Sequence, residues 1–359
     1  MVIDLKKYSR EELNVILNEF KIVSKEYSFQ SLTSGYINDT FLVLNQGQPL
    51  FILQRVNQNV FENIEGLMMN ISHALKRLKS NDYLQIKLVR TLSGKRYFSD
   101  RSGYWRVMTY VTDSTTHDTT TEPEIAFEAG RIIGRFHKLL ENEPIEQYID
   151  IIPKFHDLEL RKMQFLASLA RVSEEKKQTA SSTISFAKDM FKKLEAVKSG
   201  ELPQRICHND TKLNNILFST ETQKALCLID LDTVMKGHFH YDFGDAVRTL
   251  VNTAPEHEQD HEKITFEKYL FEAFVDGLAS NGSFLTKEEI QVLTYGAILM
   301  PFLHGIRALT DFLNGNIYYK VAYENQNFDR CLNLFNFTKK ALNHFDYMNE
   351  IISTKLRPG

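Results

Sequence analysis

The stretch that decides the fold of this chain is Ile206-Cys-His-Asn-Asp-Thr-Lys-Leu-Asn-Asn-Ile-Leu-Phe218, followed by Ala225-Leu-Cys-Leu-Ile-Asp-Leu-Asp232. It combines the pattern His-x-Asp-x-x-x-x-Asn with a short apolar strand that ends in carboxylates. Asp210 can accept the proton of an attacking hydroxyl, while Asn215 and Asp230 can hold Mg²⁺ on the phosphates of a nucleotide. The pattern therefore predicts phosphoryl transfer. The alternative is a simple polar turn between two strands, and it leaves the spacing and the following acid unexplained.

Length and composition fit an enzyme of this kind. The 359 residues are too many for one small core and predict two lobes or domains. A net charge of −3 provides no basic field, so we expect no nucleic-acid partner. The three cysteines, Cys207, Cys227 and Cys331, form no close pair and no metal-binding spacing. Cys207 and Cys227 lie in apolar strand sequence, which predicts buried free thiols in a reducing compartment. Without a signal-like N-terminus or an apolar run of membrane length, the expected location is the cytoplasm, with no membrane partner.

The order of the predicted elements indicates the fold class. Residues 9–26 and 61–79 are expected to form helices. Strands are expected at these positions: 28–33, 40–44, 50–56, 86–91, 96–99 and 104–111. A polar segment at 113–121 then precedes a mostly helical second half that contains one strand pair near 205–231. This order predicts an α+β, two-lobed, protein-kinase-like fold, with a small antiparallel sheet lobe over residues 1–112 and a helical lobe over 113–359.

The chain resembles the aminoglycoside phosphotransferase/choline kinase superfamily, and within it the bacterial N-acetylhexosamine 1-kinases. The main segments that carry this resemblance are 205–217, 228–235 and Tyr241-Asp-Phe-Gly-Asp-Ala-Val-Arg248. Shorter matches are found at four further places: Gly35-Tyr-Ile-Asn38, Phe51-Ile-Leu-Gln54, Trp105-Arg-Val107 and Gly305-Ile-Arg307. The resemblance implies a kinase that uses ATP and Mg²⁺ and is specific for the anomeric hydroxyl of N-acetylglucosamine or N-acetylgalactosamine. Two alternatives stay open: a kinase of another small alcohol (homoserine, hydroxylysine, methylthioribose, choline or an aminoglycoside) and a catalytically silent binding protein.

Two acidic segments compete for the role of metal ligand. Asp242-Phe-Gly244 spells the magnesium motif of protein kinases, yet it begins 32 residues beyond Asp210. Asp230, 20 residues beyond Asp210, closes the next strand and is the expected ligand. By resemblance, Asp242 instead holds the backbone of the catalytic loop. Asp232 lies on the same face of an extended chain as Asp230, so it either binds a second magnesium or a water, or is a solvated acid at the strand end.

Two further residues of the loop have predicted roles. The kinase-like template implies that His208 braces the loop through hydrogen bonds. Lys212 is expected to neutralise the γ-phosphoryl group as charge develops; the alternative is a solvated lysine.

The nucleotide side departs from the usual kinase pattern. The segment 33–40 lies where a glycine-rich loop would cover the phosphates, yet Gly35 is its only glycine. The following strand carries Gln54 and Arg55 where a phosphate-pairing lysine is expected. An ion pair of Arg55 with Glu62 or Glu65 would replace the missing one, and a plain surface pair is the alternative. The residues expected to bind the nucleotide are Ser34, Gly35, Asn38, Thr40, Gln54 and, at the end of the lobe, Tyr110.

The acceptor is expected to bind to the helical lobe. Thr286-Lys-Glu-Glu289 is a capping box that opens a helical run to residue 313, and Pro301 should kink this run. Beyond the kink, His304, Arg307 and Asp311 lie on one stripe of the helix. We expect Arg307 and Asp311, together with Tyr36, to bind the sugar, with Tyr318 and Tyr319 stacking on it; a structural Arg–Asp brace is the alternative.

Overall fold

The computed structural model describes residues 8–23, 26–32, 37–195, 202–256, 258–319 and 321–359. The chain divides into two compact units. The sheet unit comprises Met1–Ser114, Glu146–Ile152 and Leu231–Met235, and the helical unit comprises the remainder. Among the helices in the described ranges, none combines the length and the apolar character needed to cross a membrane.

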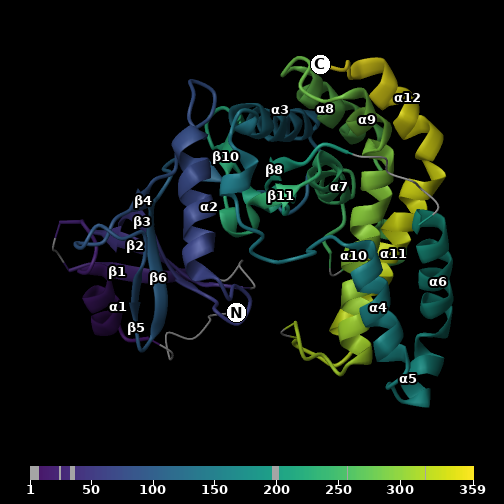
Figure 1. The fold of residues 1–359 in the computed structure, drawn as a ribbon, viewed down its shortest axis with the longest axis horizontal. Helices are drawn as coiled ribbons and strands as arrows, with labels where there is room; N and C mark the ends of the chain where they lie inside the picture. Colours follow the sequence, from purple (N-terminus) through teal and green to yellow (C-terminus); the bar gives the residue numbers. More distant parts are fainter. Residues whose placement is uncertain (1–7, 24–25, 33–36, 196–201, 257, 320) are drawn as a thin grey trace. The chain divides into compact units, whose positions relative to one another are not determined.

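The sheet unit contains an antiparallel sheet, shown in purple and blue in Figure 1. Its strands run in the order β1 (Ser28–Leu32), β2 (Asp39–Asn45), β3 (Gln48–Val56), β6 (Gly103–Thr109) and β4 (Leu88–Val89), and β5 (Phe98–Asp100) also pairs with β6. Side chains alternate between the two faces. One face buries Phe41, Val43, Leu53, Trp105 and Val107 in a core with α1 (Arg10–Leu17). The other face therefore holds the intervening residues, which include Thr40, Gln54 and Arg106.

The first helix is shorter than the sequence predicts. Ser9 and Glu12 form a capping box at its start, but α1 ends at Leu17. Beyond it, the chain turns to pair with the segment after β4: the Lys21 N–H donates to Arg90 O, and the Leu92 N–H donates to Glu19 O, both at 2.8 Å. These long-range hydrogen bonds replace the helical ones. The second helix of this unit, α2, spans Ile64–Arg77.

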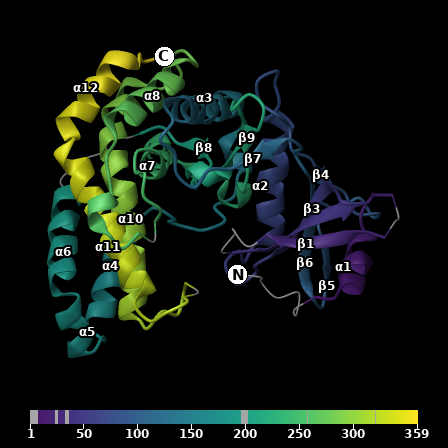
Figure 2. The same cartoon turned by 180° about the vertical axis from the view of Figure 1, so that it is seen from behind.

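The helical unit is built on closely packed helix pairs, visible from both sides in Figures 1 and 2. α3 (Pro123–Leu140) packs against α8 (Lys268–Ala279), and α10 (Leu293–Leu313) packs against α7 (Phe239–Leu250). Glycines permit the close approach, because a Cβ on Gly244 of α7 would overlap the backbone of Gly296 in α10. This packing places α7, which carries Asp242 and Asp245, firmly in the core of the unit.

Further helices surround these pairs. α10 also packs against α4 (Leu158–Leu169), α6 (Ser181–Glu195), α11 (Gln326–Asn343) and α12 (Phe345–Lys355). Two short helices complete the set: α5 (Glu174–Thr179) and α9 (Lys287–Gln291). The predicted capping box at Thr286 is confirmed. The helical run is divided at Val292, and Pro301, where a kink is predicted, lies within α10.

Short strands carry the signature sequence. β8 (Arg205–Cys207) pairs with β11 (Met235–Gly237), while β9 (Ile216–Ser219) and β10 (Ala225–Leu228) form a hairpin whose sheet includes β7 (Ser114–Thr115). The predicted strand pair is therefore confirmed. Cys207 and Cys227 are buried and free, as expected, and so is Cys331.

Candidate active site

The loop between β8 and β9 brings together three of the predicted functional residues. A 3₁₀ turn at Leu213–Asn215 places Asn215 so that its Nδ2 donates to both the backbone O and the Oδ2 of Asp210, each at 2.8 Å. Lys212 Nζ lies 3.6 Å from Asp210 Oδ2. Asp210 and Lys212 remain about one-quarter exposed, at 24% and 25%. The arrangement provides an accessible carboxylate whose orientation is set by an amide and whose charge is balanced by an ammonium group.

Asp230 lies within electrostatic reach of this group. The carboxylate of Asp210 raises the pKa of Lys212 against the opposing effect of burial, and Asp230 raises it further. The backbone supports the placement, because the Ile229 N–H donates to Asn215 O at 2.9 Å and ties the end of β10 to the catalytic loop. Asp230 itself has a left-handed backbone with φ of 60°. Asn215 and Asp230 supply the amide and carboxylate oxygens that Mg²⁺ prefers, and their role as ligands remains a prediction.

Asp242 anchors the backbone of the catalytic loop, as the resemblance implies. Its carboxylate accepts hydrogen bonds from the backbone N–H groups of His208 at 2.8 Å and Asn209 at 2.7 Å. Its backbone O accepts a bond from Thr211 Oγ1 at 2.6 Å. Asn209 has a left-handed φ of 63°, and these bonds hold it there. His208 braces the same loop, with Nε2 lying 2.9 Å from Ile229 O, so its predicted hydrogen-bonding role is confirmed.

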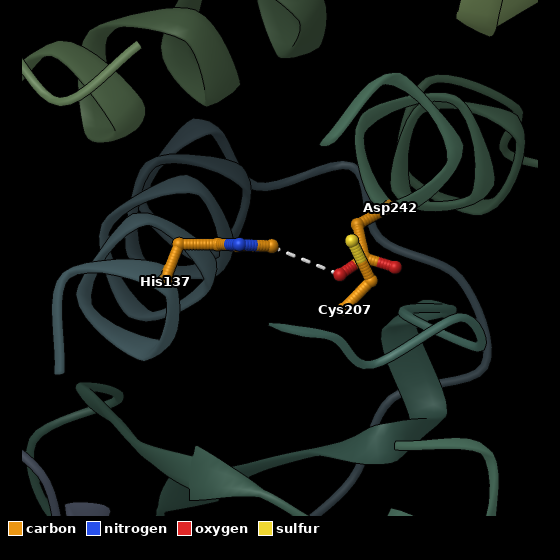
Figure 3. A group of neighbouring side chains, drawn as sticks. All are labelled: His137, Cys207 and Asp242. Carbon is orange, nitrogen blue, oxygen red and sulfur yellow. Dashed lines mark hydrogen bonds and ion pairs between the residues drawn. The ribbon is translucent and has the colours of Figure 1, made fainter. Parts of the chain in front are cut away.

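A buried trio behind the loop has the composition of a metal site (Figure 3). One potential ligand atom from each of His137, Cys207 and Asp242 lies within 4.8 Å of the others. However, His137 Nε2 contacts Asp242 Oδ2 directly at 2.9 Å, and the carboxylate also receives the two loop N–H groups. Burial, followed by the charge of Asp242, raises the pKa of the Cys207 thiol well above its usual range, which disfavours the thiolate that a metal requires. The trio is therefore best described as a hydrogen-bonded anchor for the loop.

The three residues of the predicted stripe on α10, His304, Arg307 and Asp311, contact different parts of the protein. His304 Nε2 lies 3.1 Å from Asp245 Oδ1, and the Arg307 guanidinium lies over the Phe155 ring at 5.2 Å from its centroid. Asp311 accepts hydrogen bonds from the backbone N–H groups at 318 and 319 and from the Asn327 amide, at 2.8 to 2.9 Å. Within the described ranges no Arg307–Asp311 ion pair forms, so the alternative of an Arg–Asp brace is not found. The contacts make Asp311 an anchor for the loop that carries Tyr318 and Tyr319.

A buried charge network beside this stripe is absent from the sequence prediction. Arg248 Nε donates to Asp245 Oδ1 at 2.7 Å, and Arg248 also pairs with Glu256, which pairs with Arg330 at 2.9 Å. Although burial alone would raise the pKa of Asp245, Arg248 and His304 hold it well below its usual range. The spacing of Asp245 and Arg248 on one helix was the available sequence signal.

On the sheet unit, polar residues form a row on the face opposite the apolar core. Thr40, Gln54 and Arg106 are register partners on β2, β3 and β6. Gln54 Nε2 donates to Thr40 Oγ1 at 3.0 Å, and Gln54 Oε1 accepts from the Arg106 Nε and Nη2 atoms at 3.0 and 2.7 Å. Both ends of the Gln54 amide are therefore engaged within the protein. Arg106 was not among the predicted site residues, although its cation on the strand beside Gln54 was a usable signal.

Arg106 also forms an ion pair with Asp232. Arg106 Nη1 lies 2.5 Å from Asp232 Oδ1, and Asn38 Nδ2 donates to Asp232 Oδ2 at 2.7 Å. The two charged side chains are only 1% and 3% exposed. The alternative of a solvated acid at the strand end is therefore wrong, because both carboxylate oxygens are buried and engaged.

Among the described residues, Arg55 pairs with neither of the two glutamates considered as its partners. Arg55 Nη1 lies 3.6 Å from Asp39 Oδ2 and its Nε donates to Ser102 O at 2.6 Å, whereas Glu65 pairs with Arg96. Asp39 is the register partner of Arg55 on the neighbouring strand. Arg55 therefore pairs with its cross-strand neighbour and not with Glu62 or Glu65.

Comparison with known proteins agrees with this geometry. The sequence pattern of the phosphotransferase enzyme family matches residues 28–273. The chain belongs to the phosphotransferase enzyme family.

Solved structures show the same kinase-like fold at low sequence identity. A spectinomycin phosphotransferase, solved with ADP and spectinomycin, has a TM-score of 0.65 at 10% identity, covering 94% of this chain and 98% of its own. A microcompartment-associated aminopropanol kinase has a TM-score of 0.62 at 17% identity, with coverage of 94% and 98%. A choline/ethanolamine kinase family protein from Mesorhizobium loti has a TM-score of 0.58 at 14% identity, with coverage of 96% and 99%. The predicted fold class is therefore confirmed.

Several predicted nucleotide and acceptor contacts of the phosphotransferase remain predictions. Ser34, Gly35 and Tyr36 lie outside the described residues. Asn38 accepts a bond from the Asn57 N–H at 3.0 Å in addition to holding Asp232. The Tyr110 N–H donates to Leu50 O at 3.0 Å and so extends the sheet.

The phosphotransferase should lose stability in mild acid because of three histidines in the helical unit. Burial lowers the pKa of His156 and His240 to about 3 and that of His304 to about 4, from an ordinary value of 6.5. Between pH 6.5 and 4 the unfolded chain therefore binds more protons than the folded one. Stability present above pH 6.5 is lost as the pH falls through this window, by about 1.4 kcal/mol per pH unit for each neutral histidine.

Urea unfolding at a series of pH values from 7 to 4.5 measures this slope. His240→Gln should reduce the slope of the unfolding free energy against pH by about 1.4 kcal/mol per pH unit, which corresponds to one proton, because the variant has one buried histidine fewer. An unchanged slope in that variant would show that His240 does not contribute.

Proposed function

We propose that this phosphotransferase transfers the γ-phosphoryl group of ATP to the anomeric hydroxyl of N-acetylglucosamine or N-acetylgalactosamine and releases the sugar 1-phosphate and ADP. The observation that carries the transfer chemistry is the contact set Asp210–Asn215–Lys212. It combines an oriented, accessible carboxylate with a cation 3.6 Å away.

Each residue has a defined part in the proposed reaction. Asp210 accepts the proton of the acceptor hydroxyl. The hydroxyl oxygen forms the new bond to the γ-phosphorus, and the bond from that phosphorus to the bridging oxygen of ADP breaks. Lys212 balances charge on the transferring group. Asn215 and Asp230 would hold Mg²⁺, which when bound neutralises phosphate charge. The sheet unit is proposed to bind the nucleotide, and the helical unit the acceptor.

The choice of acceptor rests on the resemblance and on the charges of the helical unit. The solved relatives named above include enzymes for spectinomycin and aminopropanol. Acceptors with amino groups are commonly held by free carboxylates. Here Asp245 and Glu256 are paired with Arg248 and Arg330, and this supports a neutral acceptor such as a sugar.

A panel of acceptors tests the proposal. N-acetylglucosamine, N-acetylgalactosamine, glucose, homoserine, choline and an aminoglycoside are incubated with ATP and Mg²⁺, and phosphorus NMR locates the new phosphate. An anomeric phosphate on the N-acetylated sugars is the expected result. Phosphorylation of only a non-sugar alcohol would favour the alternative small-alcohol kinase, and nucleotide binding without any product would indicate a silent binding protein.

A further inference from the structure

Two arginines of the helical unit share one contact residue. Arg161, on α4, donates from Nη2 to the backbone O of Phe155 at 2.6 Å. Arg307, on α10, places its guanidinium over the Phe155 ring at 5.2 Å from the centroid. Because α4 and α10 pack together, two positive groups from separate helices meet at one residue.

Neither arginine has a carboxylate partner among the residues that the structure describes. The other hydrogen bond of Arg161 goes from Nη1 to the neutral Gln164 Oε1 at 2.9 Å, and its buried Nε has no partner. Burial, followed by the charge of Arg307, lowers the pKa of Arg161 to about 10. Asp157 offsets part of this effect from a distance but forms no ion pair with either arginine in the described ranges. Two adjacent, partly desolvated cations without an ion-pair partner are costly, so this pair is a candidate for binding electron-rich ligand atoms.

The pair lies beside the catalytic loop. Phe155 precedes His156 in sequence, and the two rings are 4.3 Å apart. His156 Nε2 lies 3.1 Å from the backbone O of Asn209, the residue before Asp210. This chain of contacts connects the two guanidinium groups with the proposed base.

The carboxylates around the pair are already engaged. Asp245 and Glu256 form ion pairs with arginines. Asp311 holds backbone N–H groups, and Asp157 caps α4 by accepting the Leu160 N–H at 2.7 Å. An ammonium group on the acceptor would therefore meet two cations and no uncommitted carboxylate among these four.

We infer that Arg161 and Arg307 form a cationic subsite that binds a carbonyl or carboxylate oxygen of the acceptor and rejects acceptors carrying an ammonium group at that position. This inference rests on the proposed phosphotransfer function and specifies its substrate class. An acetamido carbonyl and a sugar carboxylate share this chemistry, since both are oxygen acceptors that a guanidinium can bind.

Binding of four sugars with a common ring tests the subsite. Calorimetry measures the affinity of the wild-type protein for N-acetylglucosamine, glucuronic acid, glucose and glucosamine. N-acetylglucosamine or glucuronic acid should bind about 10- to 100-fold more tightly than glucose, as expected for a hydrogen bond to a charged group. Glucosamine should bind more weakly than glucose. Preference for N-acetylglucosamine identifies the carbonyl as the ligand, and preference for glucuronic acid identifies the carboxylate. Equal affinities, glucosamine binding as tightly as the best sugar, or no binding at all would overturn the inference.

Charge-changing variants separate recognition from a structural role. Arg307→Ala and Arg161→Ala should each abolish most of the preference for the oxygen-bearing sugar, and Arg307→Glu should make glucosamine bind more tightly than glucose. Arg171→Ala, an exposed arginine just beyond α4, is the matched control and should keep the wild-type order. If the arginines only support the fold, the variants will melt at a lower temperature with the sugar preferences unchanged, and the inference fails.

Turnover measured on the same proteins distinguishes this inference from the proposed function. Release of ADP with the preferred sugar supports both. The predicted affinity order without ADP release would retain the subsite and contradict the phosphotransfer proposal. ADP release from every sugar at equal kcat/KM would retain phosphotransfer and contradict the subsite.

Discussion

Asp210→Asn should keep the fold and the affinity for nucleotide while lowering turnover by roughly 10²- to 10⁴-fold, the usual contribution of general acid–base help. The structure explains why the loss should be specific. The Asn side chain can still accept the hydrogen bond that Asn215 Nδ2 donates at 2.8 Å, so the loop keeps its shape. The amide cannot accept the proton of the acceptor hydroxyl, and it leaves Lys212 without the negative partner 3.6 Å away.

The measurement is kcat with ATP, Mg²⁺ and the preferred acceptor, together with nucleotide binding by calorimetry. Asp118→Asn is the matched control: Asp118 Oδ1 accepts a bond from Asn214 Nδ2 at 2.9 Å in an exposed position, and the change should leave kcat within a few-fold. If Asp210→Asn retains most of the wild-type activity, the assignment of the base is wrong.

The catalytic loop could be predicted because its geometry is local. Asp210 and Asn215 lie five residues apart, so one 3₁₀ turn brings the amide to the carboxylate. The hairpin that follows returns the chain to the same loop, where Ile229 N–H bonds to Asn215 O. Residue types and spacing along one short segment contain this information. Solved structures that share as little as 10% identity with this chain have the same fold, consistent with a pattern carried by few residues.

The charged partners elsewhere could not be predicted, because they depend on long-range packing. Asn38 meets Asp232 across 194 positions of sequence, and Arg106 reaches the same carboxylate from the middle of a sheet. Burial rather than residue type decided the outcome for Asp232. A solvated acid at a strand end and an acid in a buried ion pair have the same sequence pattern. Only in the buried ion pair are both carboxylate oxygens shielded from solvent.

The predicted end of the first helix was wrong because it, too, depends on contacts between distant parts of the sequence. Residues beyond Leu17 continue the helical pattern, but their backbone N–H and C=O groups find partners next to β4. The division of the helical run at Val292 was also not predicted; Pro301, where a kink was expected, lies within α10. At the end of α1, tertiary hydrogen bonding, which a local pattern does not contain, overrode the local preference.

Asp230→Asn and Asp242→Asn should produce opposite phenotypes, although both remove one negative charge near the catalytic loop. Asp230→Asn should raise the Mg²⁺ concentration needed for half-maximal activity, because the proposed clamp on the phosphates loses a carboxylate. Its melting temperature should change little. A Mg²⁺ titration of the initial rate at saturating ATP measures the shift.

Asp242→Asn should mainly destabilise the protein. The carboxylate is buried and accepts hydrogen bonds from His137 and from the N–H groups of His208 and Asn209. An amide nitrogen at Oδ1 or Oδ2 would face one of these donors and leave it unsatisfied, at a cost of about 1–3 kcal/mol. Thermal unfolding should therefore occur at a lower temperature by several degrees, while the folded fraction keeps the wild-type Mg²⁺ dependence. If Asp242 rather than Asp230 controls the Mg²⁺ titration, the Asp-Phe-Gly segment is the metal site after all, and the spacing argument for Asp230 is wrong.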